Sequence, residues 1–448
     1  MIRKTRFLGK VTIASVVLAL LVIGIVYAAP AIVDSFDVGE QNLQVTSGSP
    51  SASGYVEDGT IMGGERDTFL NYSSGSGSTI DLRIDFEGTS NRLAYTAGDT
   101  MKGTAELQWD GDDNGASSLK YGLSRDLSGD DGFLLELLFD DRGGKLTMEA
   151  HTDSDHWSDM TINLPGGLDD PTNRMDLVFD HNSFTSRGTA GGVDWTNVNA
   201  IVMKLDGTVD PALDVTIDSV ESTSVRDYGD LPSGYGTSIL NANHIPQGLR
   251  LGNNVDTEST YNASTNANGD DTNPTGGVDD EDGVFRTPGV NWSDSTGGSV
   301  DIYVEGCGSD NTCYVSGWID WNNNNSFDDT GEQILADSDV IDGKNTKTFS
   351  IPDTANIGEG SEKWVYARFR LCDATGECNT PTAQNVTNGE VEDYYWSFGP
   401  NAVTLTRLEA TSAPSHQPVG AAAAALALLA SSMVVGGVLV LRRRGRLS

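Results

Sequence analysis

Short hydrophobic runs, separated by turn-rich stretches, recur through the body of the chain. The run FLLELLF at 133–139 is almost continuously apolar and predicts a central strand buried on both faces, whereas the strand at 213–220 opens with the alternating LDVTID and is predicted to be half-exposed. Further strands are expected at 82–86, 105–109, 146–150, 175–179 and 200–205. Because no long helical period interrupts this pattern, the fold class is predicted to be all-β.

Two longer apolar segments lie at the ends of the chain. At the start, four basic residues precede an uncharged run at 11–27 that is followed by small residues, which is the layout of a secretory signal. We predict a signal peptide at 1–28, cleaved near Ala28. An uncleaved N-terminal anchor is the alternative, disfavoured because the run is short for a span of about 20 residues. Both interpretations place the body outside the cytoplasm.

The C-terminal segment 419–441 carries no charge and is rich in Ala, Val and Leu. It is long enough to cross a hydrocarbon core of about 30 Å, and the arginine-rich tail at 442–448 marks the cytoplasmic side. We predict a linker at 399–418, a transmembrane helix at 419–441 and a single-pass cell-surface protein; a buried core helix is the disfavoured alternative. The layout resembles C-terminal sorting signals of bacterial and archaeal surface proteins. No LPxTG precedes the span, so retention by the helix itself is expected.

The chain is strongly acidic, with 28 basic and 65 acidic residues and a net charge of −37. Each terminal segment holds four basic and no acidic residues, so removing these eight charges leaves −45 on the portion between them. Such a field repels nucleic acid and anionic lipid, which argues against a polyanionic partner. Solubility in salt, cation binding and a plain solvated surface all stay open as reasons for the acidity.

The four cysteines form two pairs of equal spacing, in CGSDNTC at 307–313 and CDATGEC at 372–378. Disulfides are expected in an exported chain, and three connectivities can be drawn. We favour Cys307 with Cys313 and Cys372 with Cys378, because each bond would close one short loop. A zinc site or thiol catalysis is the weaker alternative, since no histidine is near in the sequence.

The first of two expected modules spans 34–224. Its ends, VDSFD at 33–37 and VTIDSV at 215–220, resemble the first and last strands of galactose-binding-like jelly rolls. GGERD at 63–67 and WDG at 109–111 resemble a family of such domains in exported bacterial proteins. The resemblance implies a jelly-roll β-sandwich for this module.

A sugar site in the first module would need exposed aromatic planes flanked by amides and carboxylates. Trp157, beside the polar HTDSDH segment, and Trp109 are the candidates for carbohydrate contact, whereas Trp195 beside Val193 suits core packing. Burial is the alternative for each, because tryptophan is mostly buried in folded proteins. Candidate partners are therefore glycans or other surface proteins, besides the membrane.

The second module spans 227–398 and carries four ordered motifs. These are DYGDLP at 227–232, GVDDEDGV at 277–284, WIDWN at 318–322 and NGEVEDY at 388–394. Together they resemble the successive signatures of the GEVED domain. The resemblance implies an accessory β-sandwich of bacterial surface and secreted proteins, without catalytic activity.

One loop of the second module has the spacing of a calcium site. Oxygen-bearing side chains recur at every second position after a predicted strand and end in a glutamate: Asp320, Asn322, Asn324, Ser326, Asp328 and Glu332. Such spacing wraps carboxylate, amide and backbone oxygens around a hard cation, so a structural Ca²⁺ is predicted. Asn325 would stand at the sharp turn, and asparagine tolerates the left-handed conformation. The alternative is a hairpin loop whose side chains bond its own backbone. The acidic run at 279–282 is expected to be a solvated loop.

Paired carboxylates such as Glu390 and Glu392 could in principle hydrolyse glycosides, but an acidic chain supplies such pairs by accident. No nucleotide loop, nucleophile elbow or HExxH motif occurs in the sequence. We therefore expect a non-enzymatic, membrane-anchored surface protein with an adhesive, structural or ligand-presenting role and no catalytic residues. A glycan receptor acting through the first module is the main alternative, and a surface glycoside hydrolase the weaker one.

Overall fold

The computed structural model describes residues 31–86, 91–115, 118–168, 173–269, 279–308, 311–357 and 362–399. The described residues all belong to one compact unit, and residues 401–448 lie outside the described residues. The predicted signal peptide, transmembrane helix and basic tail also lie outside them. Among the helices of the described ranges, none is long and apolar enough to cross a membrane.

The N-terminal part of the described chain consists of two seven-stranded antiparallel sheets. The first sheet has the order β11-β8-β14-β6-β5-β2, with β1 paired to β14. Its strands are β1 (Ala31–Asp34), β2 (Gln41–Val45), β5 (Ile80–Ile84), β6 (Leu93–Ala97), β8 (Gly132–Asp140), β11 (Met175–Asp180) and β14 (Asp214–Thr223). The 3-10 helix η1 (His181–Ser183) follows β11.

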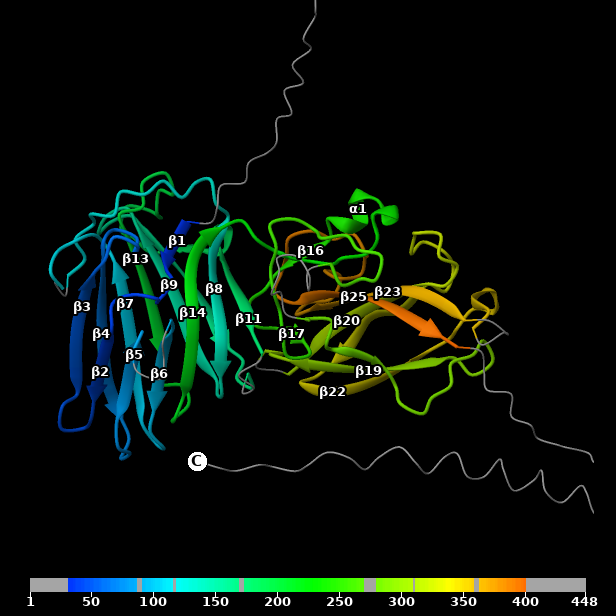
Figure 1. Ribbon diagram of the computed structural model, residues 1–448, viewed down its shortest axis with the longest axis horizontal. Coiled ribbons are helices and arrows are strands. Elements are labelled where there is room, and N and C mark those ends of the chain that lie inside the picture. Colours follow the sequence, from blue (N-terminus) through cyan, green and yellow to red (C-terminus); the bar gives the residue numbers. More distant parts are fainter. Residues whose placement is uncertain are drawn as a thin grey trace, which may run out of the picture. The chain divides into compact units, whose positions relative to one another are not determined.

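The second sheet of this module has the order β12-β10-β9-β13-β7-β4-β3. Its strands are β3 (Ser51–Glu57), β4 (Glu65–Ser74), β7 (Lys102–Trp109), β9 (Gly144–His151), β10 (Trp157–Leu164), β12 (Thr185–Ser186) and β13 (Ala200–Asp206). Figure 1 shows the two sheets as the layers of one sandwich. A single buried core draws on both, for example Leu82, Leu135 and Ile217 from the first and Leu107 and Met148 from the second.

Each strand expected in this module is present, with ends shifted by a few residues. The apolar run at 133–139 is β8, which pairs with β11 on one side and β14 on the other, so the central strand is confirmed. The alternating start of β14 is also confirmed, since Val215 and Ile217 are buried and Asp214 and Thr216 are only half-buried. β3 and β10 carry fewer apolar residues and were not expected.

The second module is built around two four-stranded sheets, with a small sheet beside them. One sheet, β17-β19-β18 with β22 on β19, contains β17 (Arg250–Leu251), β18 (Val284–Arg286), β19 (Gly298–Glu305) and β22 (Gly343–Phe349). The other, β21-β20-β23-β25, contains β20 (Cys313–Asp320), β21 (Gln333–Val340), β23 (Lys363–Cys372) and β25 (Glu390–Phe398). The small sheet joins β15 (Asp227–Tyr228), β16 (Asn243–Ile245) and β24 (Val386–Thr387).

Both faces of the β21-β20-β23-β25 sheet are covered. Its inner face packs on the β19 sheet through Val315, Val365 and Phe369, together with Val300 and Ile302. On its outer face, Trp318 lies in a separate cluster with residues of the short helices η2 (Ser233–Tyr235) and α1 (Thr237–Leu240). A further 3-10 helix, η3 (Asp353–Ala355), follows β22. Because both faces are covered there, side chains of either parity are buried at 367–372 of β23 and at 390–394 of β25.

Candidate functional site

The acidic side chains of the NGEVEDY motif point into the second module. Glu390 accepts the backbone N–H of Leu251, and Glu392 accepts that of Gly283 at 2.7 Å and the Tyr394 hydroxyl at 2.8 Å. Both glutamates are at most 1 % exposed. The strand β25 thus binds the backbone of two earlier segments through its carboxylates.

Asp393, on the opposite face of β25, forms a buried ion pair. The Arg368 guanidinium donates to both carboxylate oxygens, at 2.8 and 2.7 Å, and both side chains are fully buried. Asp393 also accepts the backbone N–H of Leu231 at 3.1 Å, and Asp227 accepts that of Val391 at 2.7 Å. The DYGDLP, VDDEDG and NGEVEDY motifs are therefore joined to one another by carboxylate-to-amide hydrogen bonds.

Burial changes the acidity of the glutamate pair. It raises the pKa of Glu390 well above its usual value, and the neighbouring carboxylates, Glu392 first, raise it further. Burial and then Asp282 do the same to the pKa of Glu392. Since both carboxyl groups are enclosed, a polysaccharide has no access to them, which disfavours the glycoside hydrolase alternative.

The acidic run at 279–282 is packed rather than solvated. Asp280 is only 4 % exposed, and Asp282 accepts the backbone N–H of Asn253 and the side-chain amide of Asn254. Burial raises the pKa of Asp282 from 3.8 to about 6. The expectation of a solvated loop was wrong for Asp280 and Asp282, whose carboxylates hold the 252–256 segment, whereas Asp279 is exposed.

The predicted calcium loop lies between β20 and β21. Asp320, fully buried, accepts the backbone N–H groups of Asn324 and Asn325 and the Tyr235 hydroxyl at 2.7 Å. Asn325 has φ of +64°, as expected for the sharp turn. Glu332, 1 % exposed, accepts the N–H groups of Trp321 and Asp329. Both ends of the predicted ligand set are therefore fixed by backbone donors.

The middle of the loop is exposed and bonds to itself. The side-chain amides of Asn322 and Asn324 both donate to Asp329 at 2.7 Å, and the Ser326 hydroxyl donates to Asp328 at 3.0 Å. Asp329, which stands outside the every-second-residue pattern, gathers the two asparagines. Asp328 and Asp329 are adjacent aspartates, and the every-second-residue pattern therefore selected Asp328.

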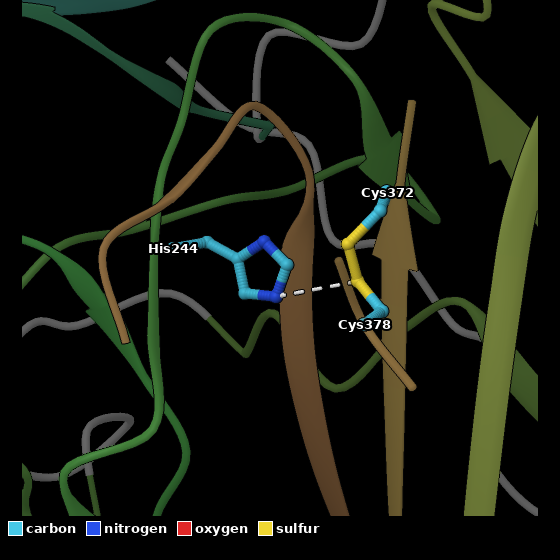
Figure 2. Close-up of side chains that lie close together, drawn as sticks. All are labelled: His244, Cys372 and Cys378. Atoms are coloured by element: carbon cyan, nitrogen blue, oxygen red, sulfur yellow. Dashed lines mark hydrogen bonds between the residues drawn. A yellow bond between two sulfur atoms is a disulfide. The ribbon is translucent and has the colours of Figure 1, made fainter. Parts of the chain in front are cut away.

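Both local disulfides are present, Cys307 with Cys313 and Cys372 with Cys378, which confirms the predicted pairing. Figure 2 shows His244, from β16, facing the second disulfide, with its Nε2 atom 4.0 Å from the Cys378 sulfur. The Arg370 guanidinium donates to that nitrogen at 3.1 Å, and burial, followed by Arg370, lowers the pKa of His244 well below its usual value. The sulfurs of Cys372 and Cys378 are bonded to each other and the Nε2 atom of His244 accepts from Arg370, so these three side chains do not form a metal site.

The two candidate tryptophans of the first module lie in different environments. Trp109 is fully buried and its indole N–H donates to Asp34 at 3.1 Å, so its ring belongs to the core. Trp157, at the start of β10, is half-buried and stacks on His151, with ring centroids 5.1 Å apart and an interplanar angle of 12°. Trp195 stacks on His181 against the core.

Arg368 and Arg370 were not singled out from the sequence, although they organise the site. In WVYARFRL at 364–371 the apolar positions explain a strand, and the two arginines suggest a solvated face. Both are fully buried instead. A buried guanidinium requires a partner, so the acidic NGEVEDY motif was the available signal for Arg368. Arg370 instead donates to His244 and to the backbone carbonyls of Asn243 and Thr380.

The comparisons with known proteins bear mainly on the second module. Residues 314–396 match the model of the GEVED domain, so this module carries that domain. No curated protein matches the chain.

Among solved structures, the chain is similar to the family 11 carbohydrate-binding module from Clostridium thermocellum in complex with a beta-1,3-1,4-mixed-linked tetrasaccharide (12 % identity, 44 % of this chain, 95 % of that chain, TM-score 0.23). The chain is also similar to the family 11 module of the cellulase Lic26A-Cel5E of Clostridium thermocellum (12 % identity, 42 % of this chain, 95 % of that chain, TM-score 0.21). A third similar structure is a beta-1,2-glucanase from Parabacteroides distasonis (11 % identity, 84 % of this chain, 40 % of that chain, TM-score 0.22). These TM-scores are too low to carry over a ligand or an activity.

Proposed function

We propose that this chain is a non-catalytic, membrane-anchored cell-surface protein whose two β modules serve adhesion, envelope structure or ligand presentation. The observation that carries the proposal is that the acidic residues of the NGEVEDY motif are bonded inside the module. Glu390, Glu392 and Asp393 accept backbone amides or an arginine inside the module and are closed to solvent. Groups used in this way stabilise a module and offer no nucleophile or acid to a substrate.

The position on the cell rests on the terminal segments of the sequence, a secretory signal before the body and an apolar span with an arginine tail after it. The test is protease treatment of intact cells that make the full chain. The body should be cleaved while a cytoplasmic marker stays whole. A variant lacking 419–448 should move to the medium. Full protection from protease, or retention of the truncated chain in the cytoplasm, would contradict the proposal.

We further propose that the loop from Asp320 to Glu332 holds a structural calcium ion. Its two buried carboxylates are already positioned by backbone donors, and the residues between them carry amide, hydroxyl and carboxylate oxygens of the kind that calcium binds. Asp328→Asn removes an exposed carboxylate without disturbing the core. Calcium should raise the melting temperature of the module in the wild-type chain and raise it less in this variant. Equal rises in both would contradict a ligand role for Asp328.

A second candidate function, glycan binding by the first module, is favoured by Trp157. Its partly exposed ring is held against His151, which is a suitable arrangement for stacking on a sugar. A glycan array probed with the full extracellular portion should lose its signal with Trp157→Ala. Trp364→Ala, at an exposed tryptophan of the second module, is the matched control. Absence of binding by the wild-type protein would remove this candidate.

A further inference from the structure

An acidic cluster in the first module lies apart from every site considered so far. Glu65 and Asp67 are consecutive same-side positions at the start of β4, and the segment after β7 brings Asp113 beside them. Oxygen atoms of these three carboxylates lie within 4.8 Å of one another. The GGERD and WDG motifs, far apart in the sequence, thus meet at one place.

The chain fold explains how the cluster is enclosed. In the register of the sheet, Asp67 lies opposite Tyr55 of β3 and Gln108 of β7. The loop after Trp109 then turns back over β4, since Asn114 and Gly115 donate their backbone N–H groups to Glu65 at 3.1 and 2.9 Å. Glu65 and Asp67 are each only 1 % exposed.

Asp67 is the unusual member of the cluster. Among the described residues, neither of its carboxylate oxygens has a hydrogen-bond partner. Its sequence neighbour Arg66 offers no compensation, because that side chain points to the other face of β4 and pairs with Asp34 at 2.9 Å. A buried carboxylate without partners destabilises the fold unless something compensates its charge.

The surroundings make this destabilisation larger. Asp110, 2 % exposed, is a further carboxylate near Asp67, and Glu57 and Asp112 form a neighbouring acidic group that shares Glu65. Burial, followed by Glu65, Asp113 and Asp110, raises the pKa of Asp67 from 3.8 to about 8. In the described part of the chain, no salt bridge involves Glu65, Asp67 or Asp110. Glu65, Asp67 and Asp110 are thus buried together without a positively charged partner in the described chain, beside the half-buried Asp113.

We propose that Glu65, Asp67 and Asp113 bind a hard divalent cation, with calcium as the expected ion. The ligands are all carboxylate oxygens, which such ions prefer over nitrogen or sulfur. Calcium binds oxygens at about 2.4 Å, so ligand atoms on opposite sides of the ion stand about 4.8 Å apart, as this cluster allows. Asp67 would supply its two unpartnered oxygens, and Glu65 would be held in place by the loop amides. The ion would fasten the loop after β7 onto β4.

The test compares three forms of the full extracellular protein, freed of metal with a chelator and titrated with calcium chloride in a calorimeter. Asp67→Asn removes the ligand charge at nearly constant volume. Asp37→Asn, at an exposed carboxylate of the same module that belongs to neither proposed calcium site, is the matched control. The wild type and the control should share a binding event that Asp67→Asn weakens at least ten-fold. Calcium should also raise the melting temperature of the first two forms by more than that of the third.

A second variant guards against misfolding. Glu65→Gln keeps an acceptor for the loop amides and should weaken the same binding event while leaving the circular dichroism spectrum unchanged. Magnesium and zinc chloride, titrated separately, should bind more weakly than calcium. If wild-type protein and Asp67→Asn give the same calcium isotherm, the cluster is not a cation site. If the wild type binds no calcium between pH 6 and pH 8, Asp67 is held by a proton shared with Glu65 and the proposal fails.

Discussion

Two groups of buried acids, one in each module, differ in whether the fold supplies them with a partner. In the second, the carboxylates of the GEVED signature each meet a donor, as Asp393 does with Arg368 and Glu392 does with the Gly283 amide. In the first, Asp67 is equally buried but has no partner among the described residues. Burial alone therefore does not distinguish a structural acid from a binding one. The distinction comes from whether the fold itself supplies the compensating hydrogen-bond donor or positive charge.

The comparison also separates two kinds of acidic segment that look alike in the sequence. The loop at 320–332 and the segment around GGERD and WDG are both rich in acidic residues. In the loop, exposed asparagines and aspartates bond to one another and to their own backbone. Around Asp67 the carboxylates face one another instead. The spacing of residues along the chain predicted the loop. The cluster at Asp67 could not be predicted in this way, because contacts between strands bring its residues together.

The largest expected effect is at the buried Arg368–Asp393 pair. Arg368→Met leaves the Asp393 charge enclosed without its partner, and removal of one member of such a pair costs about 3–5 kcal/mol. Urea denaturation of the extracellular portion, followed by tryptophan fluorescence, measures this loss. Arg142→Met is the control, because the Arg142–Asp141 pair is exposed and should change stability by less than about 0.5 kcal/mol. Similar losses in the two variants would show that the second module does not depend on compensated burial.

A smaller effect is expected at Glu390, where one carboxylate oxygen is enclosed and unpaired. The pKa of Glu390 is raised in the folded state, so the protonated carboxyl is favoured by folding. The contribution of Glu390 to the free energy of unfolding is therefore fully present below its unfolded pKa near 4.5 and is lost as pH rises. Glu390→Gln keeps an acceptor for Leu251 but cannot ionise. The variant should match the wild type near pH 4.5 and exceed it by about 1 kcal/mol at pH 8. A pH-independent difference in urea-unfolding free energy would contradict this account.

The smallest effect is expected where an acid is buried but its partner is not. Lys344 is 49 % exposed and lies 2.8 Å from Asp301, whose side chain is 2 % exposed. Two threonine hydroxyls also donate to Asp301 and would stay in Lys344→Met. The loss should be smaller than at either of the other two sites and should shrink at 1 M salt. Thermal melts at two salt concentrations measure it, and a loss as large as that of Arg368→Met would break the ranking.

Local features of this fold could be predicted from the sequence with little error. The continuous run at 133–139 gave β8, the alternation at 213–218 gave the start of β14, and the short cysteine spacings gave both disulfides. The GEVED domain was recognised from four motifs, of which WIDWN and NGEVEDY lie within the residues that match its model. Each of these signals lies within a short stretch of chain, where periodicity and spacing act directly.

Features that depend on contacts between distant segments could not be predicted in this way. The sequence predicts a surface position for Arg370, but in the fold Arg370 donates to His244 of β16. Trp109 was a candidate for carbohydrate contact, but its indole N–H donates to the buried Asp34. The cluster at Asp67 depends on the register of β3, β4 and β7. Polar residues at alternate strand positions usually predict a solvent face, and here a covering loop or a second layer reverses that expectation.

The bonds made by β25 also constrain the order in which the second module can assemble. Its carboxylates accept amides from residues that precede them by 139 positions at Leu251, 109 at Gly283 and 162 at Leu231. Contacts of such long sequence separation form late and slow the folding of β proteins. A chain that emerges N-terminus first must therefore present residue 398 before this module can close. The last strand of the first module is β14, so the first module can fold before β25, the last strand of the second module, has been synthesised.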